Sequence, residues 1–416
     1  MRLKILITAL ALTAGSAFAA DEAEKGEYIA QLGDCAACHT APGGAPFAGG
    51  LAIASPFGDI YTTNITPDPQ YGIGDYTLEE FDRAVRRGVR KDGANLYPAM
   101  PYTSYAKVSD ANMAALYAYF MKAVAPVHKP APASDLRFPF NIRFGMEGWD
   151  IVNRPEVGFT PPYDDAQLNR GAYVVEGLGH CGACHSPRNL MQAQEGYTAA
   201  SDRFLTGGTL GVWPVPDLRG PESAPQRWSD AELVEYLTTG RNAYTAATGE
   251  MALVVERSMQ HATEADMAAI VAYLKHIGLP AAASDKAAAT GAGRSDDTTA
   301  MLTAAKPDMP EGARLYLDNC GACHTVSGQG APRVFPNLVG NSLVLSDNPG
   351  GFIEVILKGA MMPSTRRAPA ALAMPGFGDR LSDDDVAALA SFIRSAWTND
   401  AGKIEAEAVK KIREQL

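Results

Sequence analysis

Three short motifs limit what this chain can fold around. Each motif has two cysteines that enclose two residues and a histidine that follows at once: CAACH ends at His39, one CGACH at His185 and a second CGACH at His324. Together the motifs contain all six cysteines of the 416-residue chain, Cys35, Cys38, Cys181, Cys184, Cys320 and Cys323. The fold must therefore accommodate three Cys-Cys-His groups that lie about 140 residues apart.

Two kinds of site explain the cysteines but leave the histidines unexplained. A redox pair of the thioredoxin type needs no histidine at the next position. A zinc site of four thiolates usually takes two cysteine pairs that are close in sequence. A covalently attached c-type haem explains both residue types, because the two thiols bond the porphyrin and the adjoining histidine ligates the iron. We therefore expect three covalent haem c groups, one at each motif.

The motifs also mark a threefold repeat of helices. Gly26, Gly171 and Gly312 lie in the helix expected before each motif, where a small residue lets the first helix cross the last at close range. After each motif comes an apolar stretch at helical spacing, preceded by a residue that favours a helix N-cap. These stretches are 112–120, 266–274 and 385–393, with caps at Ser109, Thr263 and Ser382. The pattern predicts a mainly α fold of three tandem class I cytochrome c-like domains, each around one haem.

Composition indicates where the domains end. Residues 125–165 are rich in proline and aromatic residues and predict an ordered strap between two domains. Residues 281–307 are rich in Ala, Ser, Thr, Asp and Gly, which is typical of a flexible linker. The full set of predicted segments is a signal peptide (1–19), domain 1 (20–124), the strap (125–165), domain 2 (166–280), the linker (281–307), domain 3 (308–398) and a C-terminal helix (399–416).

The first residues are typical of a secretory signal peptide. Arg2 and Lys4 precede a short apolar run, and Ala17-Phe18-Ala19 is a small-x-small cleavage site. The run is too short to cross a bilayer, which takes about 20 residues. We therefore expect a mature protein in the periplasm, peripheral to the inner membrane and without a transmembrane helix.

The formal net charge of the chain is -11, and it becomes -13 once the positive residues of the signal peptide are removed. Haem propionates add further negative charge. This balance argues against a nucleic-acid partner and against binding to anionic lipid through a general basic surface.

The sixth ligand of each iron separates electron carriers from haem enzymes. Met100 lies nine residues before the cap Ser109, and Met374 lies eight residues before the cap Ser382, each beside a proline. A single methionine near an apolar helix more often packs in the core, but the similar offsets favour ligation. We expect Met100 and Met374 to complete the first and third irons.

The second motif offers more than one candidate for this role. Met251 lies twelve residues before Thr263, whereas Met259 lies only four before it, so we favour Met251. His261 is the alternative that would give bis-histidine ligation. In the third domain the competitors of Met374 are Met361 and Met362, which lie farther from the capped helix.

The second ring nitrogen of each ligating histidine needs a partner that orients the ring, and a backbone carbonyl usually supplies it. Pro216-Asp217-Leu218 and Pro336-Asn337-Leu338 lie at suitable distances after His185 and His324. In the first domain Thr63-Asn64-Ile65 takes the place of a proline segment, which leaves the partner of His39 open.

With these parts assembled, the sequence resembles the triple-haem cytochrome c subunits of bacterial membrane-associated dehydrogenases, which oxidise alcohols, aldehydes or gluconate and related sugar acids. The resemblance covers nearly all of the mature chain. It implies axial ligation by Met100, Met251 and Met374 and a separate catalytic subunit with PQQ, flavin or molybdopterin. It also implies that electrons leave for ubiquinone or another respiratory acceptor. The stretches that support it are GDCAACHTAPGGAPFAGGLAI, FGDIYTTNITPD, LYPAMPYTSYAKVSDANMAALYAYF, CGACHSPRNL and GEMALVVERSMQ.

We therefore expect an electron-transfer subunit that is not an enzyme on its own. The sequence has no GxGxxG dinucleotide motif and no further cysteine for an iron–sulfur cluster. Two alternatives stay open at this point: a peroxidase-like haem enzyme with one open iron, and a free periplasmic triple-haem shuttle.

The chain ends with an amphipathic stripe, Ile404, Ala408, Ile412 and Leu416, with Val409 beside it. Such a stripe can rest on lipid or a partner, or it can pack on its own domain. Mixed charge and the lack of aromatic anchors favour packing.

Overall fold

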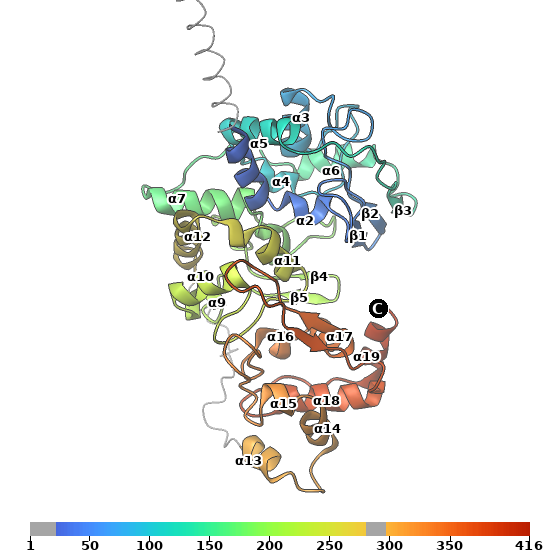
Figure 1. Ribbon diagram of the computed structural model, residues 1–416, viewed down its shortest axis with the longest axis vertical. Helices are drawn as coiled ribbons and strands as arrows, with labels where there is room; N and C mark the ends of the chain where they lie inside the picture. Colours follow the sequence, from blue (N-terminus) through green and yellow to red (C-terminus); the bar gives the residue numbers. More distant parts are fainter. Residues whose placement is uncertain (1–21, 280–296) are drawn as a thin grey trace, which may run out of the picture. The chain divides into compact units, whose positions relative to one another are not determined.

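The computed structural model describes residues 22–279 and 297–416 (Figure 1). The predicted signal peptide and residues 281–296 of the predicted linker lie outside the described residues. The remainder of that linker is not irregular: α13 (Asp297–Ala304) begins at its first described residue, and Leu302 of α13 is buried in the core next to the third motif.

The described chain is mostly helical and forms two compact units. Unit 1 comprises the described residues up to Ala183 together with Arg188–Thr198 and His261–Ile270. Unit 2 comprises Cys184–Pro187, Ala199–Gln260 and Val271–Leu416. The boundary passes through the second CxxCH motif, so Cys181 belongs to unit 1 and Cys184 to unit 2.

Unit 1 holds the first motif, the predicted strap and the helices that lead into the second motif. A small antiparallel sheet, in the order β1-β2-β3, pairs Ala52 with Tyr61 and joins the strap to the loop after the first motif through Asp59 and Asp135 (Figure 1). Its elements are a helix over residues 22–32, α2 (Cys35–His39), β1 (Ala52–Ser55), β2 (Gly58–Tyr61), α3 (Leu78–Arg87), α4 (Tyr102–Tyr105), α5 (Asp110–Lys122), β3 (Asp135–Leu136), α6 (Gly145–Asn153), α7 (Ala166–Ala172) and η1 (Tyr173–Leu178).

Unit 2 holds the rest of the second motif and all of the third. Three helices cross the boundary: α8 (Gly182–His185), the short η2 (Met259–His261) and α12 (Glu264–His276). The other elements of this part are β4 (Gly208–Leu210), β5 (Trp213–Val215), α9 (Ala224–Arg227), α10 (Asp230–Thr239), α11 (Glu250–Arg257), α13, α14 (Glu311–Asn319), α15 (Gly321–His324), α16 (Ser342–Leu345), α17 (Gly350–Lys358), β6 (Gly359–Met361), β7 (Ala373–Pro375), α18 (Asp383–Ser395) and α19 (Ala406–Arg413).

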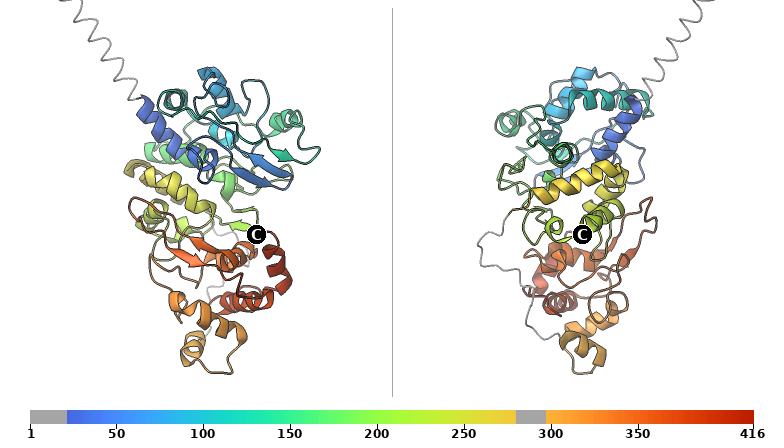
Figure 2. Two further views of the ribbon diagram at one scale, coloured as in Figure 1. Left: turned by 45° about the vertical axis from the view of Figure 1, so that its right-hand side comes forward. Right: turned by 90° about the vertical axis from the view of Figure 1, so that its left-hand side faces the viewer.

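The predicted helix crossing is confirmed at two of its three glycines. A Cβ at Gly26 would lie 2.0 Å from the Ala115 oxygen of α5, and a Cβ at Gly312 would lie 2.3 Å from the Ala388 oxygen of α18. Only a residue without a side chain permits this approach, which Figure 2 shows for the helix of residues 22–32 and for α14. For Gly171 the close crossing stays a prediction.

The three predicted N-caps are confirmed. The Ser109 hydroxyl accepts from the Asn112 N–H at 3.3 Å, and the Thr263 hydroxyl accepts from the Asp266 N–H at 3.2 Å. Ser382 forms a full capping box with Asp385. Such caps satisfy backbone donors that the first turn of a helix leaves without partners, which fixes where α5, α12 and α18 begin.

The C-terminal stripe packs on its own unit. Ile404, Val409 and Ile412 are buried in the core that also contains α14, α17 and α18. Arg413 holds α19 against the start of α18, because its guanidinium pairs with Asp383 at 2.8 Å. The packing interpretation of this segment is therefore confirmed for its buried residues.

Candidate haem sites

Each CxxCH motif is a short helical turn at the end of a longer helix. The first lies on α2, the second on α8 and the third on α15. Ahead of the first two motifs the chain adopts a left-handed conformation, with φ of 52° at Asp34 and 38° at His180. This conformation is uncommon for residues other than glycine. It turns the chain sharply between the longer helix and the motif.

The three motif histidines share one contact. Nδ1 of His39 lies 2.7 Å from the Thr63 oxygen. Nδ1 of His185 lies 2.9 Å from the Pro216 oxygen, and Nδ1 of His324 lies 2.9 Å from the Pro336 oxygen. The two proline partners confirm the prediction. In the first domain, where the partner of His39 was left open, the Thr63 carbonyl is that partner.

This contact determines which nitrogen faces the iron. A carbonyl oxygen can only accept, so the Nδ1 atom of each ring carries the proton and Nε2 has the lone pair that a metal requires. Burial lowers the pKa of His39, His185 and His324 below that of an exposed histidine. The rings are therefore neutral, as metal ligation demands. The donor set of each motif fits a covalent haem c.

Two of the thiols do not fit a redox pair. Burial raises the pKa of Cys35 and of Cys320 to about 12, whereas a redox-active cysteine needs an accessible thiolate. Within residues 22–279 and 297–416, no group of three or more His, Cys, Asp and Glu side chains is placed to hold a metal ion. A zinc site of four thiolates is therefore not assembled in this part of the chain.

The predicted axial methionines lie in three different settings. Met100 is half-buried and packs against the cluster of Tyr102, Trp149 and Ala193 in unit 1. Met251 lies in the first turn of α11 and is half-buried. Met374 lies on β7, where it pairs with Ala360 of β6 and packs against the core of unit 2.

The competitors of Met374 have other surroundings. Met362 is buried, and its sulfur lies 4.0 Å from a guanidinium nitrogen of the buried Arg241. The same guanidinium donates to the Ala370 oxygen at 3.1 Å. Met361 is 61% exposed. The choice of Met374 over these two residues stays a prediction.

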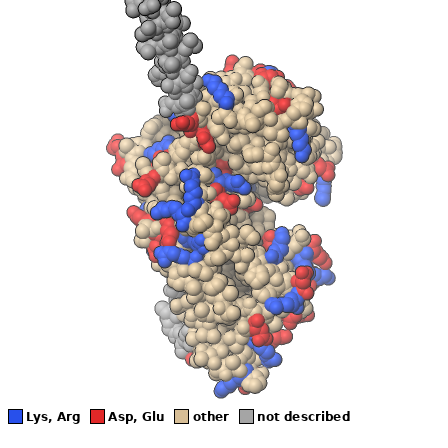
Figure 3. All heavy atoms as spheres, in the orientation of Figure 1, with Lys and Arg blue, Asp and Glu red and all other residues tan. Residues whose placement is uncertain are grey.

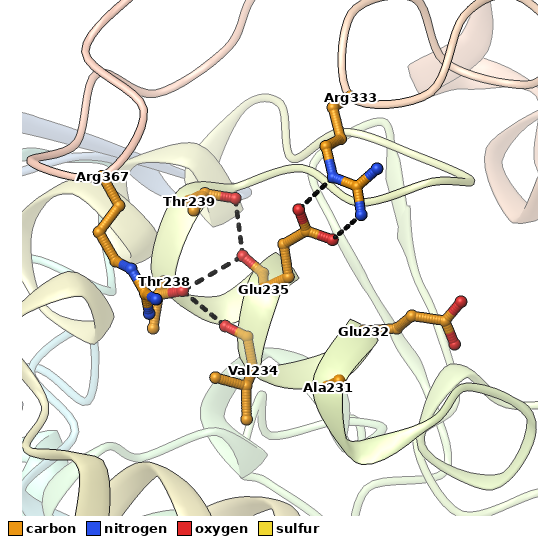
Figure 4. A pocket seen from close by; sticks show the side chains of 8 residues that line it. All are labelled: Ala231, Glu232, Val234, Glu235, Thr238, Thr239, Arg333 and Arg367. Atoms are coloured by element: carbon orange, nitrogen blue, oxygen red, sulfur yellow. Dashed lines mark hydrogen bonds and ion pairs between the residues drawn. The ribbon is translucent and has the colours of Figure 1, made fainter.

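A pocket of about 520 Å³ in unit 2 does not belong to these sites (Figure 4). It lies beside α10 and is flanked by Arg333 and Arg367. The Arg333 guanidinium pairs with both carboxylate oxygens of Glu235, one of them at 3.0 Å. None of the described residues that line it comes from a CxxCH motif.

Sequence reasoning missed a contact that links the first two motifs. His180 directly precedes Cys181, is half-buried and lies close to the Gly33 backbone, which lies ahead of the first motif. The Tyr105 hydroxyl donates to the Gly33 oxygen at 2.5 Å, and the Tyr105 ring meets His180 edge-on. The signal in the sequence was a histidine beside a motif, which alone does not identify a partner.

The surface in Figure 3 has both signs of charge. Lys and Arg side chains are interspersed with Asp and Glu on the face that this view presents. A partner that docks on this face would meet both positive and negative side chains.

Comparison with known proteins identifies the family. The Cytochrome c family model matches residues 169–278 and 310–397. The cytochrome c subunit of the alcohol dehydrogenase (quinone) of Gluconobacter oxydans (strain 621H) is 42% identical over 99% of this chain and 87% of its own length. The gluconate 2-dehydrogenase cytochrome c subunit of Pantoea cypripedii is 42% identical over 99% of this chain and 95% of its own. The chain belongs to the family of dehydrogenase cytochrome c subunits.

A third member of this family is the fructose dehydrogenase cytochrome subunit of Gluconobacter japonicus, which is 39% identical over 94% of this chain and 82% of its own length. Membership makes the chain an electron-transfer protein and not a catalytic subunit. It does not favour the open-iron enzyme or the free shuttle. Within the described residues, no helix is both long enough and apolar enough to cross a membrane.

Proposed function

We propose that the chain is the cytochrome subunit of a periplasmic dehydrogenase complex and holds three haem c groups in three helical domains. It passes electrons from a catalytic subunit with PQQ, flavin or molybdopterin to ubiquinone or another respiratory acceptor. The observation that supports this most directly is the Nδ1-to-carbonyl hydrogen bond, which recurs at His39, His185 and His324. The family membership supports the dehydrogenase partner.

The chain's own residues prepare each site. In each motif the two cysteines would form the thioether attachments, and the histidine would ligate through Nε2. The Thr63, Pro216 and Pro336 carbonyls hold the proton on Nδ1 and fix the orientation of the ring. When bound, haem c supplies a reversible one-electron couple.

We also propose Met100, Met251 and Met374 as the sixth ligands. A thioether at that position raises the reduction potential and keeps small molecules from the iron, which suits electron transfer. The exposure of Met361 and the contact of Met362 with Arg241 support the choice of Met374. For the second site, Met259 is buried at the start of the 3-10 turn η2, and both Met259 and His261 stay competitors of Met251.

The proposal is tested by expressing the chain in a host with haem-maturation enzymes, with and without the neighbouring dehydrogenase genes. A haemochrome assay should count three haems per chain, and each Cys-to-Ala pair should remove one. Reduction by ethanol, acetaldehyde or gluconate should require the partner. A cytochrome that reacts with substrate or peroxide alone, with a high-spin band, would contradict the proposal.

A further inference from the structure

A buried arginine of unit 2 lacks the partners that other buried cations have. Among the described residues five Lys and Arg residues are buried: Arg86, Lys107, Arg219, Arg241 and Arg394. Arg86 pairs with Asp110 and Lys107 with Glu176, each at 2.7 Å. Arg241 is only 9% exposed, yet it pairs with no carboxylate in the part of the chain that the structure describes.

Backbone carbonyls hold two of these arginines but not Arg241. The Arg219 guanidinium donates to four carbonyl oxygens, two of them at 2.7 Å. The Arg394 guanidinium donates to three, at 2.6 to 2.8 Å. Arg241 reaches only the Arg333 oxygen at 3.4 Å and the Ala370 oxygen at 3.1 Å, and its Nε has no partner among the described residues. Burial of a guanidinium is costly unless its charge and its N–H groups are satisfied, so an anionic partner would be strongly favoured here.

The threefold repeat shows that the fold itself does not require this charge. In each repeat one helix lies between the motif and the predicted axial methionine, and it ends at a glycine with a positive φ. The residue after that glycine is Val89 in the first repeat, Arg241 in the second and Ala360 in the third. Apolar residues fill the equivalent place in two repeats, so the arginine has a purpose particular to the second.

Arg241 contacts the segment that follows the third motif. Its guanidinium donates to the oxygen of Arg333, which lies three residues before Pro336. The Pro336 carbonyl is the partner of the His324 ring. The backbones of the two segments also meet, because the Arg333 N–H donates to the Asn242 oxygen at 3.1 Å. Arg241 is therefore held against the segment that orients the third motif histidine.

The same side chain contacts the loop between β6 and β7. The Met362 sulfur, 4.0 Å from the guanidinium, and the Ala370 oxygen both belong to this loop. The loop leads into β7, which carries Met374, the proposed sixth ligand. Arg241 thus bridges a segment that positions the histidine ligand and a segment that leads to the proposed methionine ligand.

Haem c supplies an anion that suits this position. Its two propionates are carboxylates on one edge of the macrocycle, and histidine and methionine bind the iron from opposite faces. A cation that touches the segments of both ligands is placed to reach that edge. The planar fork of a guanidinium matches a carboxylate and binds it through two parallel hydrogen bonds.

We propose that Arg241, a residue of the predicted second domain, binds a propionate of the third haem. The inference rests on the proposed function, since it requires a haem at the third motif. Arg241 is a positioning residue and not a ligand of the iron. Its positive charge favours the reduced haem, which carries one positive charge less than the oxidised haem, and so raises the reduction potential of the third site.

The first test is a spectroelectrochemical titration of the full-length holoprotein. In Arg241→Gln the reduction equilibrium of one haem should shift about tenfold toward the oxidised form, which is about 59 mV for one electron. Arg241→Lys keeps the charge without the fork and should retain most of the wild-type potential. The matched control is Arg333→Gln, because that neighbouring guanidinium is already paired with Glu235. It should shift each haem by less than about twofold.

A crystal structure of the wild-type holoprotein identifies the carboxylate and does not depend on the folding of a variant. A propionate oxygen of the third haem should lie within about 3.2 Å of the Arg241 guanidinium. A propionate of the second haem in that place, or water alone, would overturn the inference.

Haem content separates this inference from the proposed function. A wild-type chain that lacks the third haem would contradict both. Three haems in Arg241→Gln with every potential within about twofold of the wild-type equilibrium would contradict the inference alone.

Discussion

The rings of Tyr105 and His180 meet edge-on with their centroids 5.5 Å apart, and the Tyr105 hydroxyl donates to the Gly33 oxygen at 2.5 Å. Gly33 lies two residues before Cys35, and His180 lies one residue before Cys181. The Tyr105 side chain therefore joins the backbone ahead of the first motif to the side chain ahead of the second. All three residues belong to unit 1.

This contact predicts how stability depends on pH. Burial lowers the pKa of His180 from 6.5 to about 4. The unfolded chain takes up a proton below about pH 6.5, whereas the folded chain stays neutral until about pH 4, so stability falls across that window. The loss should reach roughly 3 kcal/mol at pH 4, as measured by urea denaturation at pH 7 and at lower pH.

The variant His180→Gln should lack this part of the pH dependence. The control His128→Gln, at an exposed ring paired with Asp68, should keep it. Identical pH profiles for wild type and His180→Gln would show that the ring is not held neutral.

Asp266 of α12 should be important for the stability of unit 1. Its carboxylate binds Arg170 through two bonds of 2.7 Å each and also accepts from the Tyr28 hydroxyl. Asp266→Asn leaves a partly buried guanidinium without its counter-charge, which should cost roughly 2 kcal/mol in thermal or urea unfolding. Asp230→Asn, which breaks a solvent-exposed pair with Lys275, should change stability by less than about 1 kcal/mol.

Gly312→Ala tests the helix crossing of unit 2. The added Cβ would meet the Ala388 oxygen at 2.3 Å, so α14 and α18 must separate, which should destabilise unit 2 by about 1–3 kcal/mol. Gly402→Ala is the control, because nothing lies within 4 Å of a Cβ at that position. Equal melting temperatures for the two variants would mean that the crossing tolerates a methyl group.

Met374 and Met362 are distinguished by spectroscopy. Under the proposed ligation, Met374→Ala opens one iron and should remove about one third of the methionine–iron absorbance in the near infrared. Met362→Leu should leave that absorbance unchanged, since its sulfur contacts Arg241. The opposite result would assign the third iron to Met362.

Features that depend on residues close together in the sequence could be predicted from the sequence. The caps at Ser109, Thr263 and Ser382 follow from residue type and position, and the Pro216 and Pro336 carbonyls follow from their offset after the motif. Thr63 could not be assigned with equal certainty, because a carbonyl contact depends on the backbone path and any residue type supplies the oxygen.

Residues 138–152 show a different limit of sequence reasoning. FPFNIRF predicts order, since aromatic residues usually bury their rings. In an irregular segment there is no period of 2 or 3.6 that tells which side chains point inward. The sequence therefore leaves undetermined that Phe138 and Phe144 face solvent while Trp149 is buried.

The π-helical turn η1 ends two residues ahead of the second motif, which begins after Gly179 and His180. It contains Glu176, which reaches the buried Lys107 at 2.7 Å. A π-turn holds one residue more than an α-turn, and each residue rotates an α-helix by about 100°. Loss of a single codon between positions 173 and 178 would therefore turn the π-turn into an α-turn and leave Cys181 at nearly the same angle about the helix axis. Loss of one codon from the regular helix α7 would instead rotate Cys181 by that angle relative to the start of the helix. The chain thus tolerates a deletion within η1 more readily than one a single turn earlier.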